Sequence, residues 1–291
     1  MPTADAIQWV LATAPNVPTI SGRVVKVMAW QATSMTAVLT EIRDRTLIIT
    51  LNRPEVRNAV DGDIATGVEA AVDQLEQNDD LLVGIITGNG SAFCAGADLK
   101  VLSQVDPNAM PALTKRGHFA GFANRERTKP VIAAVNGPAV AGGFEIVLAC
   151  DLVVATTTAV FGLPEVKRSL VAFAGGVFRS PRALPLNVAM EMALTGEPID
   201  VERAYSLGFV NRIVEPGKLL DEALALANVI TANAPLAVRE IRQIVRGAVH
   251  HDDHEQFLAA REASRRVERT EDYREGPRAF VEKRPPVWKG R

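Results

Sequence analysis

The chain has 291 residues, of which 47% are hydrophobic and 23% are charged, and its formal net charge at pH 7 is −2. This composition is typical of a packed globular protein with one large domain, or one domain with an appendage. The small net charge argues against a general attraction to nucleic acid, so we expect no nucleic-acid partner. The sequence has no apolar run of roughly 20 residues, so we expect no membrane span and no membrane partner.

Residues 1–34 differ from the rest of the chain. They are rich in Ala, Thr, Pro and Val and show no clear hydrophobic period. They lack an early basic stretch followed by a clean apolar segment, which argues against a secretory signal. Two interpretations stay open: an extension upstream of a natural start at Met35, or a genuine arm that we expect to be poorly ordered.

Hydrophobic patterns predict strands alternating with helices over residues 35–235. Short apolar runs bounded by turn residues predict strands at 38–42, 46–51, 83–87, 130–135 and 152–155. Three charged residues separate the first two runs, which predicts a hairpin. Asp61 is placed to cap a helix that reaches about Gln77, because apolar residues then recur at helical spacing. Further helices are predicted to begin near Ala97 and to cover 110–127 and 142–150.

From Gly175 onward the pattern is almost entirely helical, apart from a strand at 210–214. Pro235 is well placed to open a helix, because a proline at the first helical position loses no intrahelical hydrogen bond. Charged helices with a thin apolar stripe follow it. We therefore predict an α/β (α+β) core at 35–235 and a helical region at 236–291 that packs on a neighbouring subunit.

Two segments place small residues between a predicted strand and a predicted helix. They are Ser91–Leu99, which contains Ala95-Gly96-Ala97, and Asn136–Glu145, which contains Ala141-Gly142-Gly143. Small side chains let a ligand approach the main chain, and the first N–H groups of a helix are unpaired and partly positive. Two such groups converging on one oxygen would form an oxyanion hole. Alternatively, the glycines only permit tight strand-to-helix packing.

Several blocks occur in a characteristic order from about Met35 to the C-terminus. They are Leu51-Asn52-Arg53-Pro54 with Asn58-Ala59, Phe93–Leu99, Asn136–Glu145 with Ala149-Cys150-Asp151, Phe161–Glu165, Ala204–Val214 and Glu275–Phe280. Together they resemble the crotonase (enoyl-CoA hydratase/isomerase) superfamily. The resemblance implies a crotonase-like spiral core of ββα units, followed by a helical trimerisation region. It also implies a homotrimer or a homohexamer.

The resemblance implies an acyl-CoA substrate, with CoA entering as part of the substrate and with no metal or redox cofactor. The N–H groups of Ala97 and Gly142 would hold the thioester oxygen. Arg57, Ala95 and Lys100 would flank the CoA channel, where the two cations are placed to meet phosphates. An oxyanion-hole donor of this kind is typically worth about 10²–10³ in rate.

Glu145 and Glu165 match the two acidic positions of family members that hydrate a 2-enoyl thioester. One carboxylate activates water for attack on the β-carbon, while the other supplies the α-proton. We assign Glu145 as the principal base and Glu165 as the principal acid. Because close carboxylates repel, the pKa of one of them should rise until that group stays protonated near neutrality.

The resemblance therefore implies an enoyl-CoA hydratase, and three alternatives stay open. Isomerases of the family generally keep only the second acid. A dehydratase of a branched or polar acyl-CoA would use the same scaffold. A relative that only binds acyl-CoA or RNA would differ in class, although both acids and the negative net charge argue against it.

One stretch departs from the family pattern. After Glu165, hydratases of the family usually carry Pro-Gly-Ala-Gly-Gly, whereas this chain reads Ala172-Phe173-Ala174-Gly175-Gly176 and has Ser169 where Gly is common. The retained Gly-Gly pair still lets the next helix face the site. Phe173 is expected to change the acyl pocket, so acyl length and branching stay open.

Other residues that could carry chemistry have structural explanations. Asp98 is expected to cap the helix after Ala97. Cys94 and Cys150 lie in apolar sequence, which predicts reduced thiols in a cytoplasmic protein. His250-His251-Asp252-Asp253-His254 does not have the His-Glu-x-x-His spacing of zinc enzymes and is expected to be a charged helix turn. No serine-hydrolase elbow or phosphate-loop lysine motif occurs, which disfavours those two enzyme classes.

Overall fold

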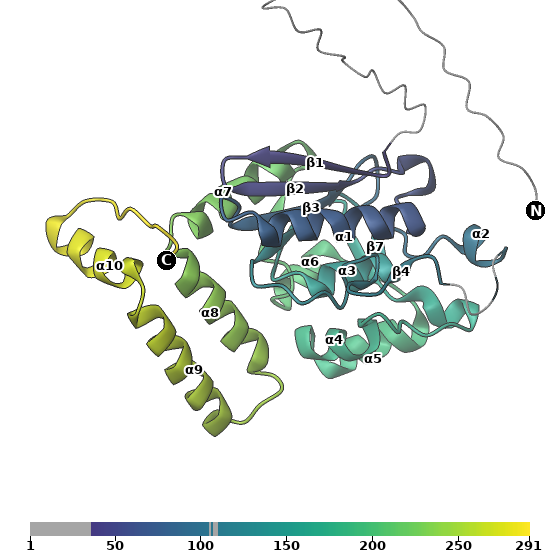
Figure 1. The fold of residues 1–291 in the computed structure, drawn as a ribbon. Helices are drawn as coiled ribbons and strands as arrows, with labels where there is room; N and C mark the ends of the chain where they lie inside the picture. Colours follow the sequence, from purple (N-terminus) through teal and green to yellow (C-terminus); the bar gives the residue numbers. More distant parts are fainter. Residues whose placement is uncertain (1–35, 105, 107–109) are drawn as a thin grey trace, which may run out of the picture. The chain divides into compact units, whose positions relative to one another are not determined.

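The structure, a computed structural model, describes residues 36–104, 106 and 110–291, and the predicted extension at 1–34 lies outside them. The largest sheet has six strands in the order β1-β2-β3-β6-β8-β11 (Figure 1). The β1–β2 pair is antiparallel, and all other neighbours in this sheet are parallel. The strands are β1 (Val38–Arg43), β2 (Thr46–Leu51), β3 (Val83–Gly88), β6 (Val131–Val135), β8 (Leu152–Thr156) and β11 (Arg212–Val214). The predicted hairpin and the predicted strands of this sheet are confirmed.

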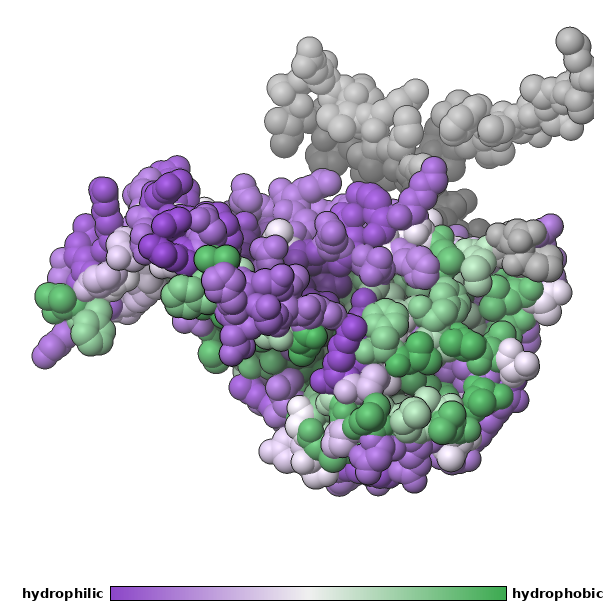
Figure 2. All heavy atoms as spheres, turned by 90° about the horizontal axis from the view of Figure 1, so that it is seen from below, coloured by the Kyte–Doolittle hydropathy of each residue, from purple (hydrophilic) through white to green (hydrophobic). Residues whose placement is uncertain are grey.

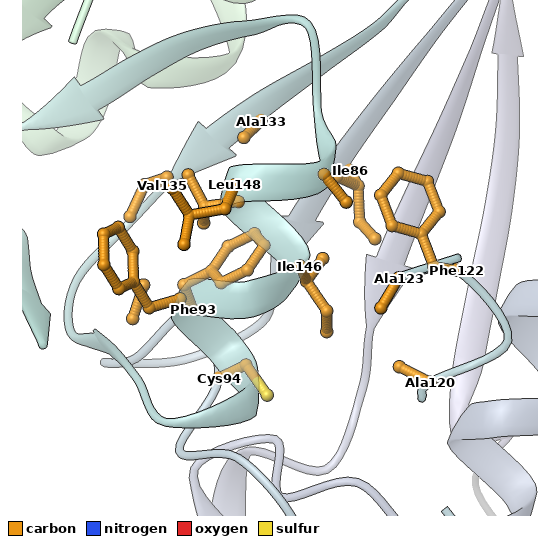
Figure 3. Packing of buried hydrophobic residues seen from close by; sticks show 14 of the residues in the cluster. Ile86, Phe93, Cys94, Ala120, Phe122, Ala123, Ala133, Val135, Ile146 and Leu148 are labelled. Carbon is orange, nitrogen blue, oxygen red and sulfur yellow. The ribbon is translucent and has the colours of Figure 1, made fainter. Parts of the chain in front are cut away.

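Alternate residues of the sheet face two separate layers, as expected from the period of two in a strand. On β3, Ile86 belongs to the core that includes residues of α1 (Gly62–Gln77) and α3 (Gly142–Ala149), whereas Ile85 packs in the layer that contains α7 (Leu219–Thr231). Figure 3 shows Ile146 and Leu148 of α3 among buried neighbours from several strands and loops. All eight residues of α3 are buried, so the predicted buried helix is confirmed.

The cap of α1 follows from the sequence. The Asp61 side chain accepts a hydrogen bond from the N–H of Ile64 at 2.9 Å, and Asp61 itself has extended backbone. Residues four apart on the helix, such as Val68 and Val72, are fully buried. This confirms both the predicted start and the predicted apolar face.

A second sheet brings the chain segments that follow two of its strands, β7 and β9, next to each other. It has the order β10-β9-β7, with β7 (Ala139–Val140), β9 (Val160–Gly162) and β10 (Ile199–Asp200). The β7–β9 pair is parallel, and the N–H of Ala141 extends it by donating to Gly162 O at 2.9 Å. The segments that follow the two strands, α3 and the 3₁₀ helix η2 (Pro164–Arg168), therefore start from the same edge. None of these three strands was predicted.

The helix predicted at 110–127 is wrong. Over this range the chain forms turns and two short paired strands, β4 (Leu113–Thr114) and β5 (His118–Phe119). His118 and Ala120 have φ of 59° and 55°, and Gly121 has 64°. A right-handed helix cannot contain a run of positive φ values. A Cβ atom built on Gly121 would overlap Ala65 O of α1, so close packing on α1 requires glycine and this tight turn.

Helices cover most of the remaining described chain. They are α2 (Leu99–Leu102), α4 (Gly176–Ala183), α5 (Leu186–Thr195), α6 (Val201–Ser206), α8 (Pro235–Gly247), α9 (Asp253–Glu268) and α10 (Glu271–Glu282), with 3₁₀ helices η1 (Pro54–Val56) and η3 (Pro216–Lys218). Figure 1 shows α8, α9 and α10 following one another at the C-terminal end. The predicted helical C-terminal region is confirmed, and Pro235 opens α8 as expected.

Candidate active site

The amide of Ala97 is turned away from the segment beside it. Val60 and Ala97 form an isolated parallel bridge, in which the N–H of Val60 donates to Gly96 O at 2.8 Å and the N–H of Asp98 donates to Val60 O at 2.9 Å. Both bonds use the groups of Val60, so the N–H of Ala97 points to the opposite side. It donates no hydrogen bond within the described part of the chain.

The amide of Gly142 opens α3 and belongs to the second small-residue segment. The first N–H groups of a helix have no intrahelical acceptor, and no described group accepts from Gly142. The two small-residue segments touch: the N–H of Val140 donates to Cys94 O at 3.1 Å. A Cβ atom built on Gly96 would lie 3.1 Å from the nitrogen of Gly142. Both amides therefore reach one place from different parts of the sequence.

Glu145 lies one turn into α3, so its carboxyl is close to the helix N-terminus. It is only 3% exposed, and its Oε1 accepts a hydrogen bond from the N–H of Gly176 at 2.8 Å. Burial raises the pKa of Glu145 to about 7, an effect that the Gly176 N–H and the charge of Arg179 only partly offset and that the charge of Glu165 reinforces. A carboxyl with such a pKa can take and return a proton near neutrality.

Glu165 lies in η2 at the end of the neighbouring strand β9. It is half-buried, and its Oε2 is buried without a hydrogen-bond partner among the described residues. Burial raises the pKa of this carboxyl above its usual value, although the charge of Arg168 acts in the opposite direction. The sequence argument predicted a raised pKa for one of the two acids, whereas the increase applies to both. Burial is its largest cause, whereas the sequence argument invoked repulsion.

The two amides and the two acids line one cavity of about 500 Å³. Its other walls are mainly apolar, with two arginines among the lining residues. The lining consists of Arg57, Ala95, Ala97, Leu99, Leu102, Met110, Phe119, Val140, Ala141, Gly142, Glu145, Pro164, Glu165, Arg168, Leu170, Val171 and Phe173. Unpaired donors beside protonatable carboxyls in an apolar cavity can stabilise an oxyanion while protons move.

Of the residues predicted to flank a CoA channel, some line the cavity and one does not. Arg57 and Ala95 line the cavity and are joined, because the N–H of Ala95 donates to Arg57 O at 3.0 Å. Lys100 is exposed on α2 and does not line the cavity. Arg168, which was not singled out from the sequence, supplies the second cation of the lining.

Phe173 and Ser169, the two departures from the family pattern, have a clear structural context. Phe173 lines the cavity, and its ring meets that of His118 edge-on at 5.7 Å between centroids. Ser169 ends η2 with φ of 55°, a conformation in which glycine is usually found. The serine therefore keeps the backbone path for which the family commonly uses glycine.

Sequence reasoning missed the wall formed by residues 110–122. Phe119 lines the cavity and packs against Gly142, on which a Cβ atom would overlap its ring. Because a helix was predicted for this range, the contact between Phe119 and Gly142 was not foreseen. The two glycines at 117 and 121 were the only sequence signal that a tight turn replaces the helix.

Asp98 and Cys94 have the structural roles expected of them, whereas the helix turn expected at 250–254 is only partly formed, because α9 begins at Asp253 and residues 250–252 lie in the connection from α8. Asp98 caps α2 by accepting from the N–H groups of Lys100 and Val101, and it pairs with Arg53 at 3.1 Å. Cys94 is fully buried, which raises the pKa of its thiol to about 12. Within the described residues, no group of three or more His, Cys, Asp or Glu side chains could hold a metal ion. None of the helices in that part of the chain is long and apolar enough to cross a membrane.

The chain is similar to known proteins in both sequence and structure. The sequence profile of the enoyl-CoA hydratase/isomerase family matches residues 41–291. An enoyl-CoA hydratase from Mycobacterium tuberculosis is 39% identical over 87% of this chain and 96% of its own length. A carnitinyl-CoA dehydratase from Salmonella paratyphi A is 41% identical over 84% of this chain and 95% of its own. A crystal structure of enoyl-CoA hydratase from M. tuberculosis superposes with a TM-score of 0.84 and 46% identity, covering 88% of this chain and all of the other.

Proposed function

The chain belongs to the enoyl-CoA hydratase/isomerase family, and we propose that it adds water reversibly to a 2-enoyl-CoA. The observation that carries this proposal is the pair of glutamates, the buried Glu145 and the half-buried Glu165, in the cavity that also holds the unpaired amides of Ala97 and Gly142. A hydration needs both parts. An oxyanion hole without a second acid would suffice for an isomerase.

In the proposed reaction the thioester oxygen accepts hydrogen bonds from Ala97 and Gly142. Glu145 takes a proton from water as the water oxygen bonds to the β-carbon, and the electrons of the double bond move onto the thioester oxygen as an enolate. Glu165 then gives its proton to the α-carbon, and the carbonyl re-forms. Dehydration reverses each step. The raised pKa of both carboxyls supports proton exchange near neutrality.

The CoA part of the substrate is proposed to leave the cavity past Arg57 and Ala95. Arg57 and Arg168 are the charged groups of the lining that suit the CoA phosphates. Lys100, exposed on the neighbouring helix α2, is proposed to contact a phosphate outside the cavity. No resident cofactor enters the proposed reaction.

The acyl part is proposed to be apolar. The walls beyond the reacting groups are formed by residues such as Leu99, Met110, Leu170 and Phe173. A carnitinyl group carries a quaternary ammonium, and among the described residues of the lining the only carboxyls are those of the two glutamates needed for the reaction. The carnitinyl-CoA dehydratases among the relatives nevertheless make that substrate the second candidate.

The experiment that tests the proposal is loss of the conjugated-thioester absorbance on mixing with enoyl-CoAs. The panel contains straight-chain, branched, aromatic and carnitine-derived acyl groups. We expect hydration of apolar members and a drop of about 10²–10⁴ in kcat for Glu145→Gln and for Glu165→Gln. Full hydration by Glu145→Gln would reject the two-acid mechanism, and tight CoA binding without any turnover would favour a binding protein.

The assembly is proposed to be a homotrimer or a homohexamer. Figure 2 shows hydrophobic residues gathered over the face of the core where α4 and α5 lie. They include Val177, Leu186, Met190 and Leu194, all of which are exposed. Apolar patches of this kind are typical of subunit contacts.

A reducing cytoplasmic location also belongs to the proposal, and the two free cysteine thiols support it.

A further inference from the structure

A second cavity lies at the opposite end of α3 from Gly142. Its volume is about 700 Å³, and it shares no lining residue with the acyl cavity. Ala149, the last residue of α3, lines it together with the loop 123–128, Arg179 of α4 and residues of α8. Neither the sequence motifs nor the proposed reaction gives this cavity a role.

Arginines dominate the lining of this second cavity. Two glutamates, Glu126 and Glu240, are its only acidic lining residues, and Glu240 is already paired with Arg266 at 2.7 Å. The arginines of the lining are Arg125, Arg127, Arg179, Arg239, Arg242 and Arg246. Positive charge therefore exceeds negative charge around the cavity.

Carboxylates behind the lining neutralise only part of this excess. Asp73 pairs with Arg125 at 2.6 Å. Asp151 pairs with Arg242 at 2.9 Å and with Arg246 at 3.1 Å. These pairs leave Arg127, Arg179 and Arg239 without an ion pair in the described part of the chain.

Arg127 is the most informative of the three. It is only 9% exposed; its Nη2 donates to Ala149 O at 2.6 Å, and its guanidinium stacks on the ring of Phe122 at 4.1 Å. Its Nε is buried and has no acceptor among the described residues. Burial removes water from the Arg127 charge, and an anion held close to its guanidinium would offset that cost.

We propose that the second cavity binds a phosphate-bearing small molecule, with its phosphate recognised by Arg127 and Arg239. Guanidinium groups offer planar, paired donors that match phosphate oxygens, and several arginines can share one dianion. Arg239 is half-buried on α8, and its side chain has no hydrogen bond or ion pair within the described residues, so its guanidinium donors are free. The volume exceeds that of a phosphate alone, which leaves space for an organic body beside Leu236 and Ala123.

The test is calorimetric titration of the assembled enzyme with pyrophosphate at constant ionic strength. Wild type is expected to bind pyrophosphate with a component that persists in Arg57→Gln, in which a cation proposed for the CoA phosphates is removed from the acyl cavity. Arg239→Gln should weaken this binding about tenfold or more, as expected for lost charged hydrogen bonds, and Arg239→Lys should weaken it less. Arg261 is an exposed arginine of α9. The variant Arg261→Gln is the matched control and should bind pyrophosphate as tightly as wild type does.

Three results would overturn the proposal. The first is no saturable binding to wild type, which would also be the result if a neighbouring subunit fills the cavity. The second is equal affinity in wild type and Arg239→Gln. The third is loss of binding in Arg57→Gln instead, which would assign the pyrophosphate to the acyl-CoA cavity. Hydration activity is not a readout here, so this test is independent of the proposed reaction.

Discussion

The Glu145 carboxyl is almost fully buried, and burial raises its pKa from 4.5 to about 7. Between these two pH values the folded chain holds a proton that the unfolded chain has released. Folding stability therefore decreases as pH rises through this window. A shift of this size corresponds to at most about 3 kcal/mol lost above pH 7. The same burial gives the group its suitability as a base near neutrality.

We predict that Glu145→Gln stabilises the protein at pH 8 and changes its stability little near pH 4.5. A neutral amide avoids burying a charge and still offers an oxygen to the N–H of Gly176. Urea unfolding at the two pH values measures the effect, while the hydration assay should show kcat of the variant lowered by about 10²–10⁴. A variant that is less stable than wild type at pH 8 would contradict the assignment of Glu145 as a costly buried acid.

The pH dependence of kcat/KM should follow both carboxyls. The active form needs Glu145 without its proton, which is favoured as pH rises through about 7, and Glu165 with its proton, which the raised pKa of Glu165 favours, so activity should pass through a maximum as pH changes. In Glu165→Gln the remaining activity should keep the rising limb and lose the falling one. A profile that is unchanged in shape would show that Glu165 is not the acid.

Adding a single methyl group at Gly142 tests the proposed oxyanion hole. A Cβ atom at this position would overlap the ring of Phe119, so Gly142→Ala must move the ring or the amide. We expect kcat to fall by about 10²–10³, the cost of losing one oxyanion donor. Gly217→Ala is the matched control, because a Cβ atom there meets nothing within 4 Å. An unchanged kcat in Gly142→Ala would argue against this amide as a donor.

At the scale of elements, the strand-like segment around Val60 positions the amide of Ala97. The bridge on either side of Ala97 fixes the direction of its N–H. Asp98 then ends this segment by capping α2 and by pairing with Arg53, which also donates to Ala59 O at 2.7 Å. The orientation of one donor therefore depends on a small network outside the cavity.

We predict that Asp98→Asn lowers kcat about tenfold while KM changes little, because the lost ion pair with Arg53 disturbs the Ala97 amide, whereas asparagine still caps α2 and keeps its residues in the acyl wall. Steady-state kinetics separate the two parameters. Asp200→Asn is the matched control, since Asp200 caps α6 by accepting from the N–H of Arg203 and does not line the acyl cavity. Equal losses in both variants would point to general destabilisation instead.

The sequence predicted those elements whose signals are local. Asp61 before an apolar helical period gave the start of α1, and Ala141-Gly142-Gly143 after a strand gave the start of α3. The wall at 110–122 could not be predicted in this way. Its apolar residues suit a helix, but positive φ at His118 and Ala120 and the contact of Phe119 with Gly142 decide its path. These are tertiary constraints, which override helix propensity.

The candidate site shows the same division. Glu145, Glu165, Ala97 and Gly142 were placed by motif, and the structure brings them to one cavity. Their catalytic roles stay predictions. Arg168 was missed because only the parallel pairing of β7 and β9 shows that η2 starts beside α3.

At the scale of the whole molecule, the chain after α10 folds back and fixes this helix. The N–H groups of Lys289 and Gly290 donate to the Asp272 carboxylate at 2.7 and 2.9 Å. The indole of Trp288 donates to Ala232 O at 2.7 Å. These contacts hold α10 while Phe280 and Val281 stay 85% and 78% exposed. Large apolar side chains on a fixed helix suit a neighbouring subunit.

We predict that Phe280→Asp combined with Val281→Asp prevents assembly without unfolding the chain. Both side chains already face solvent in the single chain, so charges there cost the fold little but would be buried unpaired in a subunit contact. Sedimentation should show a trimer or hexamer for wild type and for Arg261→Gln, and a smaller species for the double variant. Circular dichroism should be unchanged in all three. A monomeric wild type, or a double variant that still assembles fully, would exclude α10 as the contact surface.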